Sequence, residues 1–146
     1  MKKILYFDMD NVLVDFQSGI DQLSPELKEQ YKDDLDEVPG IFGLMKPVDG
    51  AIDAFNLLAE KYEVYILSTA TWENPSAWCD KLEWVKKYLG ANAYKRLILS
   101  HNKQLNKGDY LIDDRLKNGA GEFEGELIHF DTEQFPDWAS VLKYLL

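Results

Sequence analysis

One stretch near the start of the chain decides the fold: Ile4-Leu5-Tyr6-Phe7-Asp8-Met9-Asp10-Asn11-Val12. Its first four residues form an uninterrupted apolar run, which is typical of a strand buried on both faces of a parallel sheet. The run stops at Asp8, and a second carboxylate follows at Asp10. Because ligands of doubly wound sheets bind beyond the carboxyl ends of the strands, this carboxylate pair predicts a site at that edge.

Four further apolar runs follow the first, and stretches with helical spacing separate most of them. The runs cover residues 64–67, 97–99 and 110–112 and, more weakly, 127–130. Helices are expected over 51–61, from Asn74-Pro75 to Gly90, and from Pro136 to about Tyr144. Strands that alternate with helices predict an α/β fold with a doubly wound, parallel, five-stranded sheet.

Residues 15–50 interrupt this alternation. They contain nine acidic residues and three lysines, a net charge of −6. Ser24-Pro25-Glu26 resembles the start of a helix. We therefore predict a small helical cap at 15–50, inserted after the first strand of a core made of 1–14 and 51–146. The alternative is one acidic surface helix with long loops.

Composition restricts the possible partners. The chain has 146 residues, enough for one domain with a small insertion, and a formal net charge of −10. That charge argues against binding nucleic-acid polymers or anionic membranes. No apolar run approaches the ~20 residues of a membrane-spanning helix. Cys79 is the single cysteine, which excludes an intrachain disulfide and fits a cytoplasmic protein. The expected ligand is a small molecule; the oligomeric state is left open.

Polar residues also follow the other predicted strands. Ser68 and Thr69 follow the second run, and Lys103 comes shortly after the third. Asp113 and Asp114 end the fourth. Each of these is common in turns, but four carboxylates at one edge of a sheet would repel one another without a cation. Mg²⁺ prefers such oxygen ligands together with phosphate, so the pattern predicts a magnesium and phosphate site.

The order of these residues resembles the motifs of the haloacid-dehalogenase-like phosphatases. Asp8–Val12 is similar to the first motif, and Ser68 to the second, a hydroxyl that binds phosphate. Lys103, ten residues before the first aspartate of the fourth motif, matches the phosphate-binding lysine of the third; Lys107 is a competitor at shorter spacing. Ile112–Asp114 resembles the fourth motif.

This resemblance implies a mechanism with an aspartyl-phosphate intermediate. Asp8 would be the nucleophile, and Asp10 the group that protonates the leaving oxygen and then activates water. Mg²⁺ would be held by Asp8, Asp113 and, by family analogy, the backbone carbonyl of Asp10. Asp114 would lie outside this set and orient Lys103 or a metal-bound water.

A closer resemblance is to the 5′(3′)-deoxyribonucleotidases of that superfamily, carried by residues 39–42, 46–51, 65–70 and 81–90. It implies a nucleoside monophosphate substrate, with Phe16 and Phe42 around the base. Thr69 would be a phosphate or sugar contact, and Lys81 a further phosphate contact. The other interpretations are that both rings are ordinary core residues and that Lys81 is a solvated helix lysine.

Three departures from that family's pattern leave the substrate open. Ala70 stands where a proline is common, Trp72 where a lysine is expected, and His101 where an arginine is expected. The alternatives are therefore a phosphosugar, another phosphometabolite or a phosphoprotein as substrate. A receiver-like signalling domain and a non-catalytic binding protein are more remote alternatives, since a receiver carries no cap and its acidic pair is adjacent.

Overall fold

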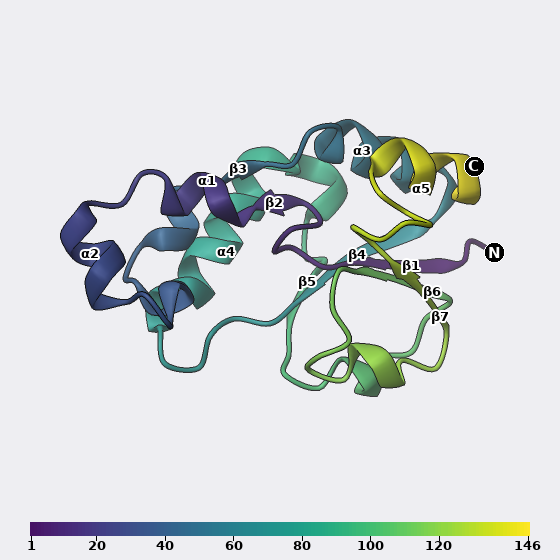
Figure 1. The fold of residues 1–146 in the computed structure, drawn as a ribbon. Helices are drawn as coiled ribbons and strands as arrows, with labels where there is room; N and C mark the ends of the chain where they lie inside the picture. Colours follow the sequence, from purple (N-terminus) through teal and green to yellow (C-terminus); the bar gives the residue numbers. More distant parts are fainter.

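Five parallel strands form the central sheet of the computed structural model, which describes residues 1–146 (Figure 1). The strands are β1 (Ile4–Phe7), β4 (Glu63–Ser68), β5 (Leu97–Leu99), β6 (Tyr110–Asp113) and β7 (Glu126–His129). Their order in space is β5-β4-β1-β6-β7. The predicted α/β fold with a five-stranded parallel sheet is confirmed.

The central strand β1 marks the point where the chain changes direction. After β1 the chain builds β4 and β5 on one side, then crosses back to add β6 and β7 on the other. Phe7 pairs with Ile66 of β4 and with Ile112 of β6. The connections leaving β1 and β6 therefore diverge at their carboxyl ends, which opens a crevice for a ligand there.

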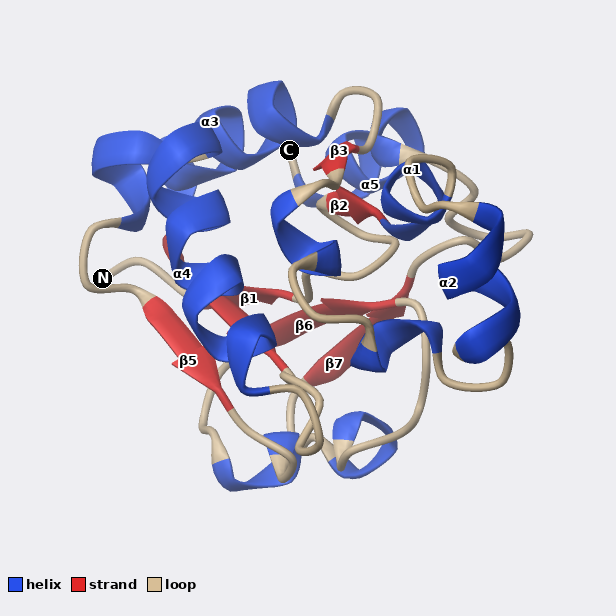
Figure 2. Ribbon diagram, turned by 90° about the vertical axis from the view of Figure 1, so that its left-hand side faces the viewer, coloured by secondary structure: helices blue, strands red, loops and turns tan.

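Three helices cover one face of the sheet: α3 (Ala51–Lys61), α4 (Pro75–Tyr88) and α5 (Trp138–Leu145), above the strands in Figure 2. The main apolar core lies between them and the sheet. At its centre the Phe7 ring lies 5.0 Å from that of Phe55 on α3 and 5.7 Å from that of Trp138 on α5. The strand that carries the carboxylate pair is thus anchored by aromatic packing.

The opposite face has no α-helix. Loops with two short 3₁₀ turns, η4 (Lys103–Leu105) and η5 (Ala120–Glu122), cover a smaller apolar cluster of Tyr6, Leu67, Leu111, Ala120 and Phe123. The predicted doubly wound order of the strands is present. The helices, however, cover only one face of the sheet. The link from β5 to β6 is too short to hold a helix of several turns and still cross two strands.

The helix ends differ in detail from the predicted ones. α4 begins at Pro75 as expected, yet the Asn74 side chain does not cap it. After α4, Gly90 adopts the predicted left-handed conformation with φ of 61° and begins the 3₁₀ turn η3 (Gly90–Ala93). The last helix begins at Trp138 instead of Pro136, because Asp137 caps it through a reciprocal pair with Ser140.

The inserted segment is helical and starts and ends on a short two-stranded ribbon. β2 (Val14–Asp15) pairs antiparallel with β3 (Lys46–Pro47), and between them lie α1 (Phe16–Ile20), α2 (Pro25–Gln30), η1 (Leu35–Glu37) and η2 (Ile41–Gly43). Ser24 caps α2 as predicted. The turn η2 packs on α4, beside the sheet in Figure 1. No helix of the chain is both long and apolar enough to cross a membrane.

Candidate active site

A tight turn after β1 directs the two carboxylates of the opening stretch. The Met9 carbonyl accepts hydrogen bonds from the backbone N–H groups of residues 12–14, and Asn11 has a φ of 63°. The Met9 side chain is buried in the core, between the two aspartates. Trp138 of α5 donates its indole N–H to the Val12 carbonyl at 2.9 Å, which ties the turn to the helical layer.

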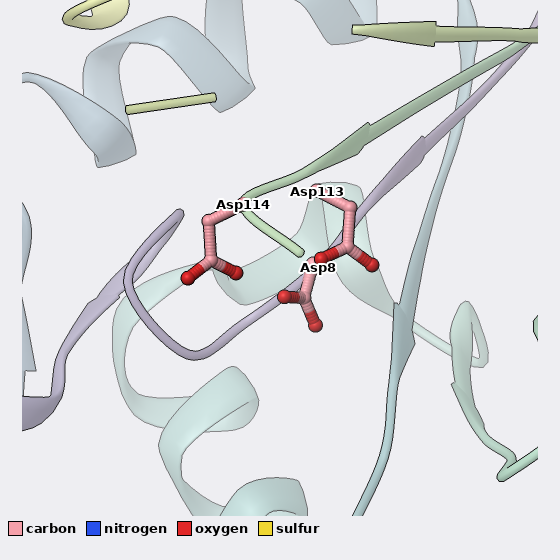
Figure 3. Close-up of side chains that lie close together, drawn as sticks. All are labelled: Asp8, Asp113 and Asp114. Atoms are coloured by element: carbon pink, nitrogen blue, oxygen red, sulfur yellow. The ribbon is translucent and has the colours of Figure 1, made fainter. Parts of the chain in front are cut away.

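Three carboxylates meet at the carboxyl ends of β1 and β6, as Figure 3 shows. One oxygen each of Asp8, Asp113 and Asp114 lies within 4.8 Å of the others. Burial and the neighbouring Asp8 charge raise the pKa of Asp113 and of Asp114 to about 7. Oδ1 of Asp114 is buried without a hydrogen-bond partner. Crowded, partly unpartnered carboxylate oxygens are the donor set that fits Mg²⁺.

Lys103 supplies the positive charge at this cluster. Its ammonium lies 3.0 Å from Oδ1 of Asp8 and 2.6 Å from Oδ2 of Asp113, and the residue is buried. Burial alone would lower the pKa of Lys103, but these two carboxylates raise it above its usual value. For Asp8, burial alone would raise the pKa, but the ammonium groups of Lys103 and Lys81 hold it below its usual range. Asp8 is therefore ionised, as a nucleophile must be.

The Asp114 carboxylate lies beside those of Asp8 and Asp113. Lys103 contacts Asp8 and Asp113, and it makes no hydrogen bond to Asp114. Of the two roles predicted for Asp114, orienting Lys103 has no hydrogen bond behind it, and orienting a metal-bound water stays a prediction. Nε2 of His129 on β7 lies 3.0 Å from the Asp114 carbonyl oxygen and steadies its backbone.

The side chain of Asp10 turns away from this cluster, toward Lys81. The Lys81 ammonium, on α4, lies 3.2 Å from each Asp10 oxygen and 2.8 Å from Oγ of Ser68. Lys81 is fully buried, so the interpretation as a solvated helix lysine is wrong. Burial raises the pKa of Asp10 above its usual value although Lys81 opposes that shift. A raised pKa suits a carboxyl group that delivers a proton.

A small pocket opens beside Asp10. It has a volume of about 300 Å³ and is lined by Asp10, Asn11, Phe16, Leu35, Asp36 and Arg115. Leu35 and Asp36 are not among the predicted site residues, because nothing in the local pattern of the inserted segment indicates which residues face the core. Arg115 also lines the pocket, and its backbone N–H donates to Oδ1 of Asp113 at 3.0 Å.

The two predicted base-stacking rings differ in position. Phe16 lines the pocket, and its ring packs edge to face on that of Phe42, with centroids 5.8 Å apart. Phe42 is only 3% exposed, belongs to the core, and has the Lys81 ammonium 4.7 Å from its ring centre. Phe42 therefore has no open face on which a base could stack. Its position fits the alternative that this ring is an ordinary core residue.

The two predicted hydroxyl residues have different partners. Ser68 is buried, and its Oγ accepts a hydrogen bond from Lys81. The Thr69 hydroxyl donates to the Ser100 carbonyl at 2.7 Å, so it joins the ends of β4 and β5. A direct phosphate contact would require that bond to break. Trp72 is exposed on the following loop and packs edge to face on His101, with ring centroids 5.9 Å apart.

Gly119 allows Lys103 to sit at the cluster, which gives a prediction. Gly119 has a φ of +84°, and a Cβ there would overlap the Gln104 side chain and lie 2.9 Å from the Lys103 backbone nitrogen. Gly119→Ala should lower kcat by roughly tenfold or more, since small misplacements of catalytic groups are costly. Gly90→Ala is the matched control: φ is +61° with no atom within 4 Å. Equal kcat values for the two folded variants would contradict the prediction.

Comparison with known proteins identifies the family. A family model described as "5' nucleotidase, deoxy (Pyrimidine), cytosolic type C protein" matches residues 20–136. A Vibrio phage KVP40 protein named "Putative 5'(3')-deoxyribonucleotidase" is 66% identical over 144 residues, covering 99% of this chain and 85% of that protein. The "5'(3')-deoxyribonucleotidase" of Bacillus subtilis is 33% identical over 151 residues, covering 90% of this chain and 87% of that protein.

Solved structures support the fold. The magnesium-bound "putative HAD-hydrolase YfnB" of Bacillus subtilis superimposes with a TM-score of 0.65 at 13% identity, over 99% of this chain and 98% of that one. A haloacid dehalogenase-like family hydrolase of Streptococcus pneumoniae gives 0.57 at 16% identity, over 98% and 90%. The family match and the relatives exclude the alternative of a receiver domain. The chain belongs to the 5′(3′)-deoxyribonucleotidase family of haloacid-dehalogenase-like proteins and is a phosphoric monoester hydrolase.

Proposed function

We propose that this protein removes phosphate from deoxyribonucleoside monophosphates in a Mg²⁺-dependent reaction with an aspartyl-phosphate intermediate. One observation carries the proposal: Asp8 and Asp10 lie together at the carboxyl end of β1, Asp8 in contact with the buried Lys103 and Asp10 with the buried Lys81. The lysines lower the pKa of Asp8, whereas burial raises the pKa of Asp10. The names of the relatives support the nucleotide as substrate.

In the first step, an oxygen of Asp8 attacks phosphorus and the bond from phosphorus to the ester oxygen breaks. Asp10 gives its proton to the departing oxygen, which leaves as the nucleoside hydroxyl. In the second step Asp10, now ionised, takes a proton from a water molecule as that water attacks the aspartyl-phosphate. The bond between Asp8 and phosphorus breaks, and phosphate is released. Asp10 regains its proton, and Asp8 is an ionised carboxylate again.

Buried charges orient the phosphate. Lys103, between Asp8 and Asp113, offers an ammonium to the phosphoryl oxygens. Because the Lys81 ammonium donates to Oγ of Ser68, that hydroxyl is free to donate its own hydrogen outward to a phosphoryl oxygen. Lys81 is thereby assigned the role of holding Asp10 and Ser68.

The acidic cluster fits a magnesium ion through the carboxylate oxygens of Asp8, Asp113 and Asp114. The backbone carbonyl of Asp10 stays a predicted additional ligand. When bound, the ion supplies positive charge that offsets the negative charge on the transferring phosphoryl group. Residues 15–50 are assigned as a cap, whose Phe16 and Leu35 form the apolar part of the pocket.

The test is phosphate release from a panel of substrates, measured with Mg²⁺ and with EDTA. The panel contains deoxy- and ribonucleoside monophosphates, sugar phosphates and p-nitrophenyl phosphate. Mg²⁺-dependent turnover with the highest kcat/KM on deoxynucleotides is expected. Turnover of sugar phosphates alone would retain the roles of Asp8 and Asp10 and refute the nucleotide substrate.

A further inference from the structure

The backbone of Asp10 is held less firmly than that of Asp8. The backbone N–H of Asp8 continues the sheet by donating to the Ile112 carbonyl at 2.9 Å. Asp10 lies beyond the strand, in the turn that the Met9 carbonyl closes, and its own backbone N–H donates to no backbone carbonyl. The position of the Asp10 carboxylate therefore depends on what fixes this turn.

One buried carbonyl of the turn has a side chain as its donor. Val12 is fully buried, and no backbone N–H donates to its carbonyl oxygen. The indole N–H of Trp138 does so at 2.9 Å, although the two residues lie 126 positions apart in the sequence. Because a buried carbonyl without a donor is unfavourable, this hydrogen bond holds the turn against α5.

The ring of Trp138 contacts the chain on the other side of the carboxylate pair. It stacks on the ring of Phe7, the residue before Asp8, with centroids 5.7 Å apart and planes at 30°. The ring of Phe130 lies 5.1 Å from it, and Trp138 itself is buried. A single side chain with few accessible rotamers thus joins the strand before Asp8 to the turn after Asp10.

We infer that Trp138 is a positioning residue, whose indole N–H fixes the turn so that Asp10 can deliver its proton to the leaving oxygen. Trp138 acts through the backbone of Val12. Proton transfer depends on the distance and direction between donor and acceptor, and a displacement of about 1 Å can lower a rate roughly a hundredfold. The inference rests on the proposed function, because it takes Asp10 as the group that protonates the leaving oxygen.

The test compares kcat/KM for the preferred deoxynucleotide with kcat/KM for p-nitrophenyl phosphate, because this constant includes the step in which the leaving group departs. A nucleoside alkoxide needs a proton to leave, whereas p-nitrophenolate does not, since its nitro group delocalises the negative charge. Trp138→Phe keeps an aromatic ring against Phe7 and removes the N–H. It should lower kcat/KM about tenfold or more on the nucleotide and less than about threefold on p-nitrophenyl phosphate.

Tyr62→Phe is the matched control. The buried Tyr62 hydroxyl donates to the Leu145 carbonyl at 2.8 Å, so this variant removes a buried hydrogen bond at the other end of the same helix. It should leave the ratio of the two kcat/KM values at the wild-type level. Replacement of Trp138 with benzothienylalanine, which has sulfur in place of the N–H and nearly the same shape, tests the hydrogen bond even where the Phe variant does not fold.

Asp10→Asn separates a failure of the inference from a failure of the proposed function. If Asp10→Asn lowers both constants equally, the proposed role of Asp10 is refuted, and the inference with it. If Asp10→Asn changes the ratio but folded Trp138 variants do not, the proposed function stands and the inference is overturned. A change of ratio in Tyr62→Phe equal to that in Trp138→Phe would also overturn it. Should deoxynucleotides not be hydrolysed, a sugar phosphate takes their place, because its leaving oxygen also needs a proton.

Discussion

Asp8→Asn is expected to lower kcat by at least about 10³-fold, on nucleotides and on p-nitrophenyl phosphate alike. The amide has nearly the same shape as the carboxylate but cannot form the aspartyl-phosphate. Asp8 also contributes one of the three closely spaced carboxylates and accepts a hydrogen bond from Lys103. Replacing Asp8 with Asn therefore removes the nucleophile and also the charge repulsion between Asp8 and its neighbours Asp113 and Asp114.

The fold should survive this substitution. Lys103 keeps its 2.6 Å contact with Asp113, so no buried ammonium is left without a carboxylate. We expect thermal unfolding of the Asn variant in EDTA to occur at or above the wild-type temperature. Asp53→Asn, on the exposed side of α3, is the matched control and should leave kcat unchanged. Wild-type turnover by a folded Asp8→Asn variant would refute the assignment of the nucleophile.

Removal of the divalent cation should abolish turnover and also change how stability depends on pH. The pKa of Asp114 is raised from 3.8 to about 7, so the folded protein holds this proton more tightly than the unfolded chain does. The free energy of unfolding of the metal-free protein should therefore fall as pH rises from about 4 to about 7. Asp113, whose pKa is also raised to about 7, contributes in the same direction.

Asp114→Asn isolates this effect. At pH 8 in EDTA the variant should unfold at a higher temperature than the wild type, because one buried like charge is gone. At pH 5 the difference should shrink, since the wild-type carboxyl is then largely protonated. Added Mg²⁺ should stabilise the wild type at pH 8 by about 2.7 kcal/mol at a hundredfold excess over Kd, and the variant much less.

The measurement is thermal unfolding at the two pH values, with and without Mg²⁺, together with phosphate release. Asp53→Asn again serves as control and should follow the wild type throughout. Equal stabilisation of wild type and Asp114→Asn by Mg²⁺ would show that Asp114 is not a ligand. The side-chain ligands would then be Asp8 and Asp113, with Asp114 outside the ligand set, as the family resemblance implies.

Local sequence determined the elements that carry the chemistry. The apolar run 4–7 is a central strand because its residues can be buried on both faces, and it ends where Asp8 begins. Ser68 and Asp113 are the last residues of their own strands, so parallel pairing alone brings them to one edge. Lys103 begins the short turn η4 on the connection from β5 to β6, which returns to the same edge.

Only the tertiary structure decided which partner each of these groups has. Lys81 lies 71 residues from Asp10 in sequence, and its burial depends on how α4 packs against η2. The same packing places Phe42 in the core, while Asp36 reaches the pocket because the β4–α4 loop holds it. Periodicity shows which residues are apolar and where a strand ends, because those preferences are local. It does not show which of two aromatic rings or several carboxylates faces a site, because that depends on contacts between segments far apart in the chain.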